Sequence, residues 1–218
     1  MIRKLLVVAA AAAMPITAIA ATGGIASAKT APVDATHYTV DCTSITAGAK
    51  FNPPLTNTAT APSDEATSIK GSASGCTVTP TSGGTAVAVT SVKIKGTIHD
   101  ATSDHTCGGL VTPTSETGSL TISWKTSPKL TSSTSVVNPT TVSGGAGADG
   151  NATFNLAYGA ATSGPFQGTD NGTSSATSAE TTTSISSILT TCGGKKGLKA
   201  IAITTNTNPG AGVAIHAG

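Results

Sequence analysis

The sequence predicts a single all-β domain, an antiparallel β-sandwich or barrel with one short helix towards its C-terminal end. Two observations predict this class. Apolar and polar residues alternate over several short segments, which is the period of strands with one buried face, and turn-forming residues separate these segments. A single segment has its apolar residues at helical spacing. The pattern suits a sandwich and a barrel equally well.

The clearest strand pattern covers residues 118–126. Leu120, Ile122 and Trp124 fall on one face, and the polar residues between them fall on the other. This segment holds the single tryptophan of the chain. We therefore expect the core to form on its apolar face.

Further strands are expected along the whole chain. In residues 85–100 the alternation changes phase at Thr90 and Ser91, which indicates either a bulge within one strand or a corner between two. Residues 51–55 contain two adjacent prolines, so we expect an edge segment or a connection there. The other expected strands are residues 37–43, 68–78, 136–142 (interrupted at Asn138 and Pro139), 152–158, 198–204 and 213–215.

The expected helix covers residues 184–192. Ile185, Ile188, Leu189 and Cys192 follow the spacing of one helix face, and the two glycines that come next predict its end. We expect a flexible glycine-rich connection over residues 144–150. Residues 168–183 are polar and suit either a solvated strand or a loop.

Residues 1–28 form a predicted signal peptide. A basic pair precedes an apolar run over residues 5–13, which is too short to span a membrane. Two A-x-A sites follow, and we favour cleavage after the second, residues 26–28, because a polar segment begins there. An anchor that is never cleaved is the alternative, and the helix-breaking Pro15 disfavours it.

Residues 29–218 are expected to form one secreted β-rich domain, either free in the medium or associated with the cell wall. Two of the 12 basic residues lie in the signal peptide, which leaves 10 lysines against 10 acidic residues. Nucleic acids and anionic membranes both require clustered positive charge, so we expect neither as a partner. No second long apolar run follows, so we expect no transmembrane segment in the mature chain.

Four cysteines lie in the mature chain: Cys42, Cys76, Cys107 and Cys192. An even number in an exported protein predicts two disulfides. Of the three possible pairings we favour Cys42–Cys76 with Cys107–Cys192, and spacing leaves the other two open. The spacings match no zinc motif.

Several short motifs occur in the same order as in a known group of proteins. They are the short signal peptide, FNPPLTNT at residues 51–58, GC at 75–76, the order C, GSLTISWK, PKLT over 107–131, and CGGKKGLK at 192–199. On these features the chain resembles small uncharacterised exported proteins of actinobacteria. The resemblance implies export and a β fold, and it carries over no functional residue.

One segment has the residue types of a metal site. His99, Asp100, Asp104 and His105 fall within seven residues, and imidazole with carboxylate suits zinc or another transition ion. The alternative is a solvated hairpin loop in which the aspartates stabilise turns. No serine-hydrolase motif is present, because the nearest match places Ala73 at the nucleophile position.

These observations favour a secreted, disulfide-bonded, non-catalytic β-domain with a binding or structural role at the cell surface or in the medium. We expect no cofactor, and a protein or glycan as the partner. The alternatives are an exported metal-dependent hydrolase with its site near residues 99–105, and a carbohydrate-binding module. A sugar-binding module usually displays exposed aromatic rings, whereas most of the rings here are expected to face the core: Tyr38, Phe51, Trp124, Phe154, Tyr158 and Phe166.

Overall fold

The computed structural model describes residues 38–59, 64–80, 85–102, 105–146, 150–159, 161–164, 166, 174–204 and 213–216. The predicted signal peptide lies outside these residues. The strands and the helix in them are β1 (Tyr38–Leu55), β2 (Ala66–Pro80), β3 (Ala88–Asp100), β4 (Thr114–Ser127), β5 (Thr134–Val137), β6 (Pro139–Ala146), β7 (Asn151–Tyr158), β8 (Ser174–Ser184), α1 (Ile185–Cys192), β9 (Leu198–Thr204) and β10 (Val213–His216).

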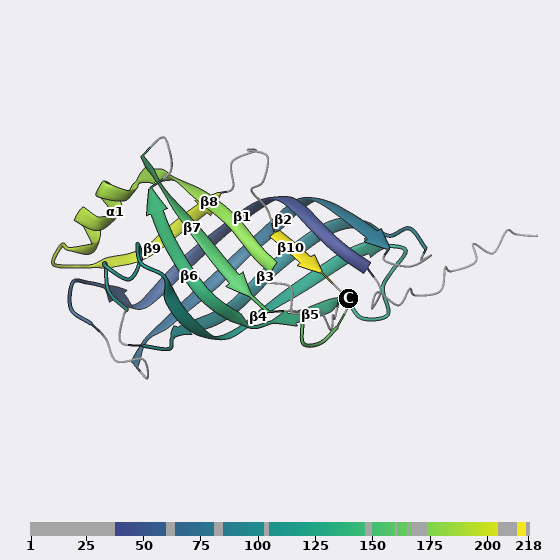
Figure 1. Cartoon of the computed structure of the whole chain (residues 1–218), viewed down its shortest axis with the longest axis horizontal. Helices are drawn as coiled ribbons and strands as arrows, with labels where there is room; N and C mark the ends of the chain where they lie inside the picture. The colour runs from purple at the N-terminus through teal and green to yellow at the C-terminus, as the bar shows by residue number, and fades with distance from the viewer. Residues whose placement is uncertain are drawn as a thin grey trace, which may run out of the picture.

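The strands form one antiparallel sheet that closes on itself. Its order is β1, β2, β3, β4, β6, β7, β8 and β9, and β9 pairs back onto β1. In Figure 1 strands β6, β7 and β8 cross in front of β1, β2 and β3, so the closed sheet has two facing layers. The two short strands lie outside this ring, β5 against β4 and β10 against β1. The predicted all-β class is confirmed, and the ring of pairings is that of a barrel.

Strands β3 and β4 carry the centre of the core, as the alternation predicts. Val92 lies opposite Trp124, Ile94 lies opposite Ile122, and all four side chains are buried. The pairing shifts by one residue between Val89 and Ser91. The change of phase in the sequence is therefore a bulge within one strand and not a corner.

The expectation for residues 51–55 needs a correction, because β1 continues through them to Leu55. Pairing with β2 ends at Asn52, and pairing with β9 skips from Lys50 to Leu55. Pro53 and Pro54 thus lie in the gap between two ladders, where no N–H is required. Adjacent prolines exclude ladder bonds at two positions and do not exclude a long strand.

Three other expectations can be compared with the strands. The break at Asn138 is confirmed, because it separates β5 from β6. Strand β6 runs to Ala146, so the connection expected from residue 144 begins later than predicted. Gly144 lies in this strand, where the carbonyl oxygen of Leu110 packs against it. A Cβ at this position would overlap that oxygen, so the close approach requires glycine. Of residues 168–183, the part from Ser174 onward is a strand.

The predicted helix is confirmed as α1. The Ser184 side chain accepts a hydrogen bond from the backbone N–H of Ser187, which caps the first turn. The helix ends at Gly193, whose N–H donates to the carbonyl oxygen of Leu189. Ile188 and Cys192 are its buried residues, so α1 packs one apolar face against the end of the sheet.

Two disulfides join elements that lie next to each other. Cys42 and Cys76 are direct partners in the pairing of β1 with β2. Cys107 and Cys192 connect the segment that follows β3 to the last residue of α1. The favoured pairing of the four cysteines is confirmed, and residues 105–113 are fixed to the end of the sheet that carries α1 (Figure 1).

Candidate functional site

An apolar cavity lies inside the closed sheet. Its volume is about 140 Å³, and strands β1 to β7 and β9 all contribute side chains to its wall. Most of the lining is aliphatic or aromatic, for example Ile45, Ile69, Ile94, Ile122, Leu156 and Ile201. Protein interiors normally leave few voids larger than a water molecule, so a space of this size marks a place where the packing is incomplete.

Two apolar clusters bound this cavity. The first contains Trp124, whose ring packs edge-on against Phe166 with the ring centroids 4.8 Å apart. The Trp124 indole N–H donates to the Ser135 hydroxyl at 2.8 Å, so the polar atom of the ring is satisfied without water. Ile94, Ile122 and Tyr158 of the same cluster line the cavity.

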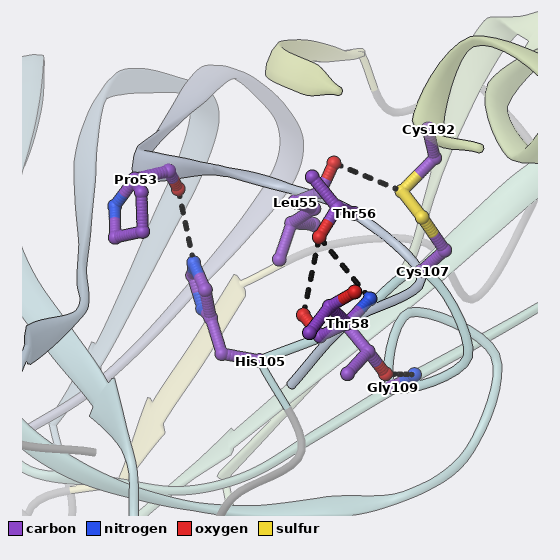
Figure 2. Close-up of a disulfide and its surroundings, with 9 residues drawn as sticks. Pro53, Leu55, Thr56, Thr58, His105, Cys107, Gly109 and Cys192 are labelled. Atoms are coloured by element: carbon purple, nitrogen blue, oxygen red, sulfur yellow. Dashed lines mark hydrogen bonds between the residues drawn. A yellow bond between two sulfur atoms is a disulfide. The ribbon is translucent and has the colours of Figure 1, made fainter. Parts of the chain in front are cut away.

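The second cluster covers the other end and involves residues 105–113. Figure 2 shows the disulfide between Cys107 and Cys192 of α1. The backbone N–H of Cys107 also donates to the carbonyl oxygen of Thr56 at 2.8 Å. Leu110 of the same segment is buried beside Ile188 in this cluster. The disulfide and the packing of Leu110 therefore hold residues 105–113, which we call the cover, in place.

A group of polar side chains lies at the edge of this cover. Glu65 has a side chain that is 1% exposed, and its Oε2 lies 3.0 Å from Nδ1 of His105. On the other side of the ring, Nε2 of His105 donates to the carbonyl oxygen of Pro53 at 3.1 Å (Figure 2). Because a carbonyl oxygen only accepts, Nε2 is the donor in this contact.

The backbone also holds Glu65 in place. Its Oε1 accepts from the N–H of Asp100 at 2.6 Å, and its carbonyl oxygen accepts from Nδ1 of His99 at 2.6 Å. Burial raises the pKa of Glu65, and the bond from the Asp100 N–H and the charge of His105 act in the opposite direction. Although His105 Nδ1 lies 3.0 Å away, Glu65 Oε2 has no partner at hydrogen-bond geometry within the described residues.

Two carboxyl groups face the cavity beside this group. Asp100 and Glu116 both line it, and their side chains are hydrogen-bonded to each other. Thr114 Oγ1 lies 2.7 Å from Glu116 Oε1 and donates to it. Burial raises the pKa of Glu116 to about 8, and the bond to Asp100 and the charges of Asp100 and Glu65 add to the rise. The Glu116 carboxyl therefore favours its protonated form near neutral pH.

The structure brings together three of the four residues proposed as metal ligands. His99, Asp100 and His105 lie around Glu65, and Asp104 lies outside the described residues. No group of three or more His, Cys, Asp or Glu is arranged to hold a metal ion in the part of the chain that the structure describes. Both ring nitrogens of His105 already contact protein oxygens. The metal set stays a prediction.

Sequence reasoning missed Glu65, Glu116 and the cavity. Glu65 precedes β2 and Glu116 lies in β4, and the pairings of β2 with β3 and β3 with β4 bring both to Asp100. Glu116 is in phase with Leu120, Ile122 and Trp124 of β4, so extending the alternation to residue 116 would have placed this acid on the inner face. No motif or short spacing relates these residues.

Most of the aromatic rings face the core, as the sequence predicts. Five of the six are buried: Phe51, Trp124, Phe154, Tyr158 and Phe166. The side chain of Tyr38 lies outside the described residues. The described surface therefore has no row of exposed rings of the kind a carbohydrate-binding module uses.

Comparison with protein-family models, curated proteins and solved structures finds no match to this chain. Within the described residues, no helix has both the length and the apolar character needed to cross a membrane. The cavity and the polar residues at its edge are the features of the described structure from which a function can be inferred.

Proposed function

We propose that the mature chain is a secreted, non-catalytic binding domain that holds a small apolar molecule inside its closed sheet. The observation that carries this proposal is the cavity of about 140 Å³ with its mainly apolar lining. An apolar cavity of about 150 Å³ lined by Leu, Ile and Phe stays dry and takes up benzene or xenon. The space here has a similar volume and a mainly aliphatic and aromatic lining, with Asp100, His105 and Glu116 at one edge.

The construction of the site supports binding in a fixed cavity. Ile94, Ile122 and Tyr158 line the cavity from the core cluster that contains the Trp124–Phe166 pair, and the Cys107–Cys192 disulfide fixes the segment of residues 105–113, which lines it from another side. A cavity that exists before the ligand arrives needs little reorganisation on binding, which favours affinity. In a domain built only for support we would expect such a space to be filled, because empty volume costs stability.

Export is supported by the predicted signal peptide and by the disulfides. Disulfides persist in oxidising compartments and are rare in the cytosol, and the described cysteines are all paired. The domain then acts at the cell surface or in the medium, where it would carry a small apolar molecule through water.

The test is a calorimetric titration of the mature domain, residues 29–218, with toluene. At about 0.8 kcal/mol for each buried carbon, seven carbons contribute about 5.6 kcal/mol, which corresponds to a Kd of about 0.1 mM. We expect binding with a Kd between about 0.1 and 1 mM and a negative heat-capacity change, because apolar surface is buried.

The contradicting result is a cooperatively melting domain whose toluene titration shows no heat of binding and whose Tm toluene leaves unchanged. The cavity would then not be a binding site for apolar molecules.

A further inference from the structure

We propose that the outer face of strands β1 to β4 binds an acidic polysaccharide, a polymer whose sugar units carry carboxylate groups. Five lysines cross this face, and we call them the lysine band: Lys50, Lys70, Lys93, Lys95 and Lys125. The band lies on the outside of the closed sheet, so this inference is independent of the cavity and of the molecule proposed to fill it.

The alternation of each strand directs these lysines outward. Each lysine directly follows a residue that is buried or lines the cavity, and successive side chains of a strand point to opposite faces. Lys93 and Lys95, for example, flank the buried Ile94 of β3. All five lysines are exposed. Because β1 to β4 are successive neighbours in the sheet, the five side chains share one outer face (Figure 1).

The pairing of the strands makes the band continuous. Lys70 of β2 lies directly opposite Lys95 of β3. Lys50 pairs with the residue two positions before Lys70. Lys125 pairs with the residue two positions before Lys93. Each lysine is therefore close to the next, either across or along a strand. Three strand spacings of about 4.8 Å and about six residues of strand rise give the band a length of about 25 Å.

The charge of the band is not neutralised within the described structure. None of the five lysines forms an ion pair with a described residue. Like charges directly opposite each other destabilise a sheet, and Lys70 and Lys95 form such a pair. A polyanion lying along the band would neutralise this repulsion, so the arrangement points to an anionic partner.

The acidic residues lie elsewhere. Of the three acids in β1 to β4, Asp100 and Glu116 line the cavity, and Asp41 lies nine residues before Lys50. The 10 lysines of residues 29–218 balance 10 acids, yet five of these lysines gather on one face. A chain with no net charge thus has a cationic surface, which attracts a polyanion over distances of about a Debye length.

The side chains around the band match a sugar polymer. Hydroxyl groups lie between the lysines on the same face, from Ser68, Ser72, Thr97 and Ser123. A hydroxyl both donates and accepts, as the hydroxyls of a sugar ring do. A lysine ammonium group is a point charge with three donors, so it binds carboxylates that arrive in different orientations. An acidic polysaccharide presents both groups along its length.

Other polyanions match this face less well. Proteins bind nucleic acids with arginine and with exposed rings on which bases stack, whereas residues 29–218 contain no arginine and most of the described rings are buried. Segments that lie on a membrane place apolar side chains beside their cationic ones. Here hydroxyl groups occupy those positions.

The experiment is a calorimetric titration of residues 29–218 with polygalacturonate at pH 7. The matched probe is the methyl ester of the same polymer, which has the same sugar units without the negative charge. At about 20 mM NaCl we expect the acid form to bind and the ester to show no binding. At about 0.5 M NaCl binding of the acid form should be lost, because exposed charges are then screened within a few Å.

A variant of the band locates the contact. Lys70→Gln/Lys93→Gln/Lys95→Gln should bind polygalacturonate about tenfold more weakly than the wild type, since each exposed charge pair contributes a factor of about 1.4 to 5. The variant should melt at or above the Tm of the wild type, because the repulsion between Lys70 and Lys95 is removed. Its affinity for toluene should be unchanged.

The matched control removes the same number of charges outside the band. Lys195→Gln/Lys196→Gln/Lys199→Gln replaces three exposed lysines that follow α1 and begin β9. Its affinity for polygalacturonate should stay within about twofold of the wild type. The comparison separates a contact with the band from an effect of net charge.

Four results would overturn the inference. They are a cooperatively melting domain that does not bind polygalacturonate at low salt, equal losses of affinity in the two triple variants, and a methyl ester that binds as tightly as the acid. The fourth is tighter binding of single-stranded DNA or of phosphatidylglycerol vesicles that the band variant weakens, because the partner would then be a nucleic acid or a membrane. Toluene binding reports on the cavity alone, so each proposal can fail without the other.

Discussion

Filling the cavity should stabilise the protein and abolish binding, and Ala49→Leu is the change that tests this. Ala49 is 6% exposed and lines the cavity from β1. Leucine adds three carbons, worth about 2.4 kcal/mol at about 0.8 kcal/mol each. The loss of side-chain freedom takes back about 0.5–1 kcal/mol. The expected net gain in the free energy of unfolding is therefore between about 1.4 and 1.9 kcal/mol.

The cavity volume gives an independent upper limit on this gain. At about 24 cal/mol for each Å³ of empty space, 140 Å³ costs about 3.4 kcal/mol, so the gain from one leucine lies within it. For a domain of this size we expect a rise in Tm of roughly 3–8 °C. Urea unfolding should show a higher midpoint with an unchanged m-value, and toluene should no longer bind.

The matched control for this variant is Ala88→Leu, the same change at an exposed position of β3. It should leave the free energy of unfolding within about 0.5 kcal/mol of the wild type and leave toluene binding intact. An Ala49→Leu variant that is less stable than the wild type by more than about 1 kcal/mol and still binds toluene would contradict this prediction, because its side chain would then clash with packed atoms outside the cavity.

Three further predictions test the Cys107–Cys192 disulfide, the Glu116 carboxyl group and the hydrogen bond between Trp124 and Ser135. Cys107→Ser/Cys192→Ser opens a loop of 85 residues and should cost about 4.5 kcal/mol of stability and also toluene binding; a variant that binds toluene normally contradicts the role of the cover. Because the pKa of Glu116 is raised, the folded state holds a proton between about pH 4.5 and 8 that the unfolded state has lost. The free energy of unfolding should therefore fall as pH rises through this range. The slope should be less than about 1.4 kcal/mol per pH unit, because the group is partly exposed. Urea unfolding at several pH values should show this slope in the wild type and a shallower one in Glu116→Gln, and equal slopes would contradict it. A double-mutant cycle of Trp124→Phe and Ser135→Ala should give a coupling of about 1 kcal/mol, and additive losses would show that their 2.8 Å bond contributes nothing.

Local patterns in the sequence predict the local parts of the fold. The alternation in residues 118–126 lies within β4, the helical spacing from Ile185 to Cys192 is α1, and the phase change at Thr90 is a bulge. These predictions succeed because each depends on side chains that face one way within a single element. The prediction from Pro53 and Pro54 was wrong because the effect of a proline on a strand depends on where the hydrogen-bond ladders to its neighbours begin and end.

The long-range features could not be predicted in this way. The closure of the sheet depends on pairing β1 with β9, which lie at opposite ends of the described chain, and no spacing rule relates them. The polar site joins Glu65, Asp100 and Glu116 through three strands. The cavity arises from the summed volumes of side chains from most strands, and no single residue indicates it.

If the proposed function is right, the interior of the closed sheet contains a mainly apolar space that accepts a ligand. X-ray diffraction from a crystal of residues 29–218 held under xenon pressure would show this, since xenon enters apolar cavities without needing polar contacts. We expect a xenon atom among Ile94, Ile122 and Leu156. Ordered water molecules at that position, or side chains that fill it and exclude xenon, would show that the cavity does not bind apolar molecules.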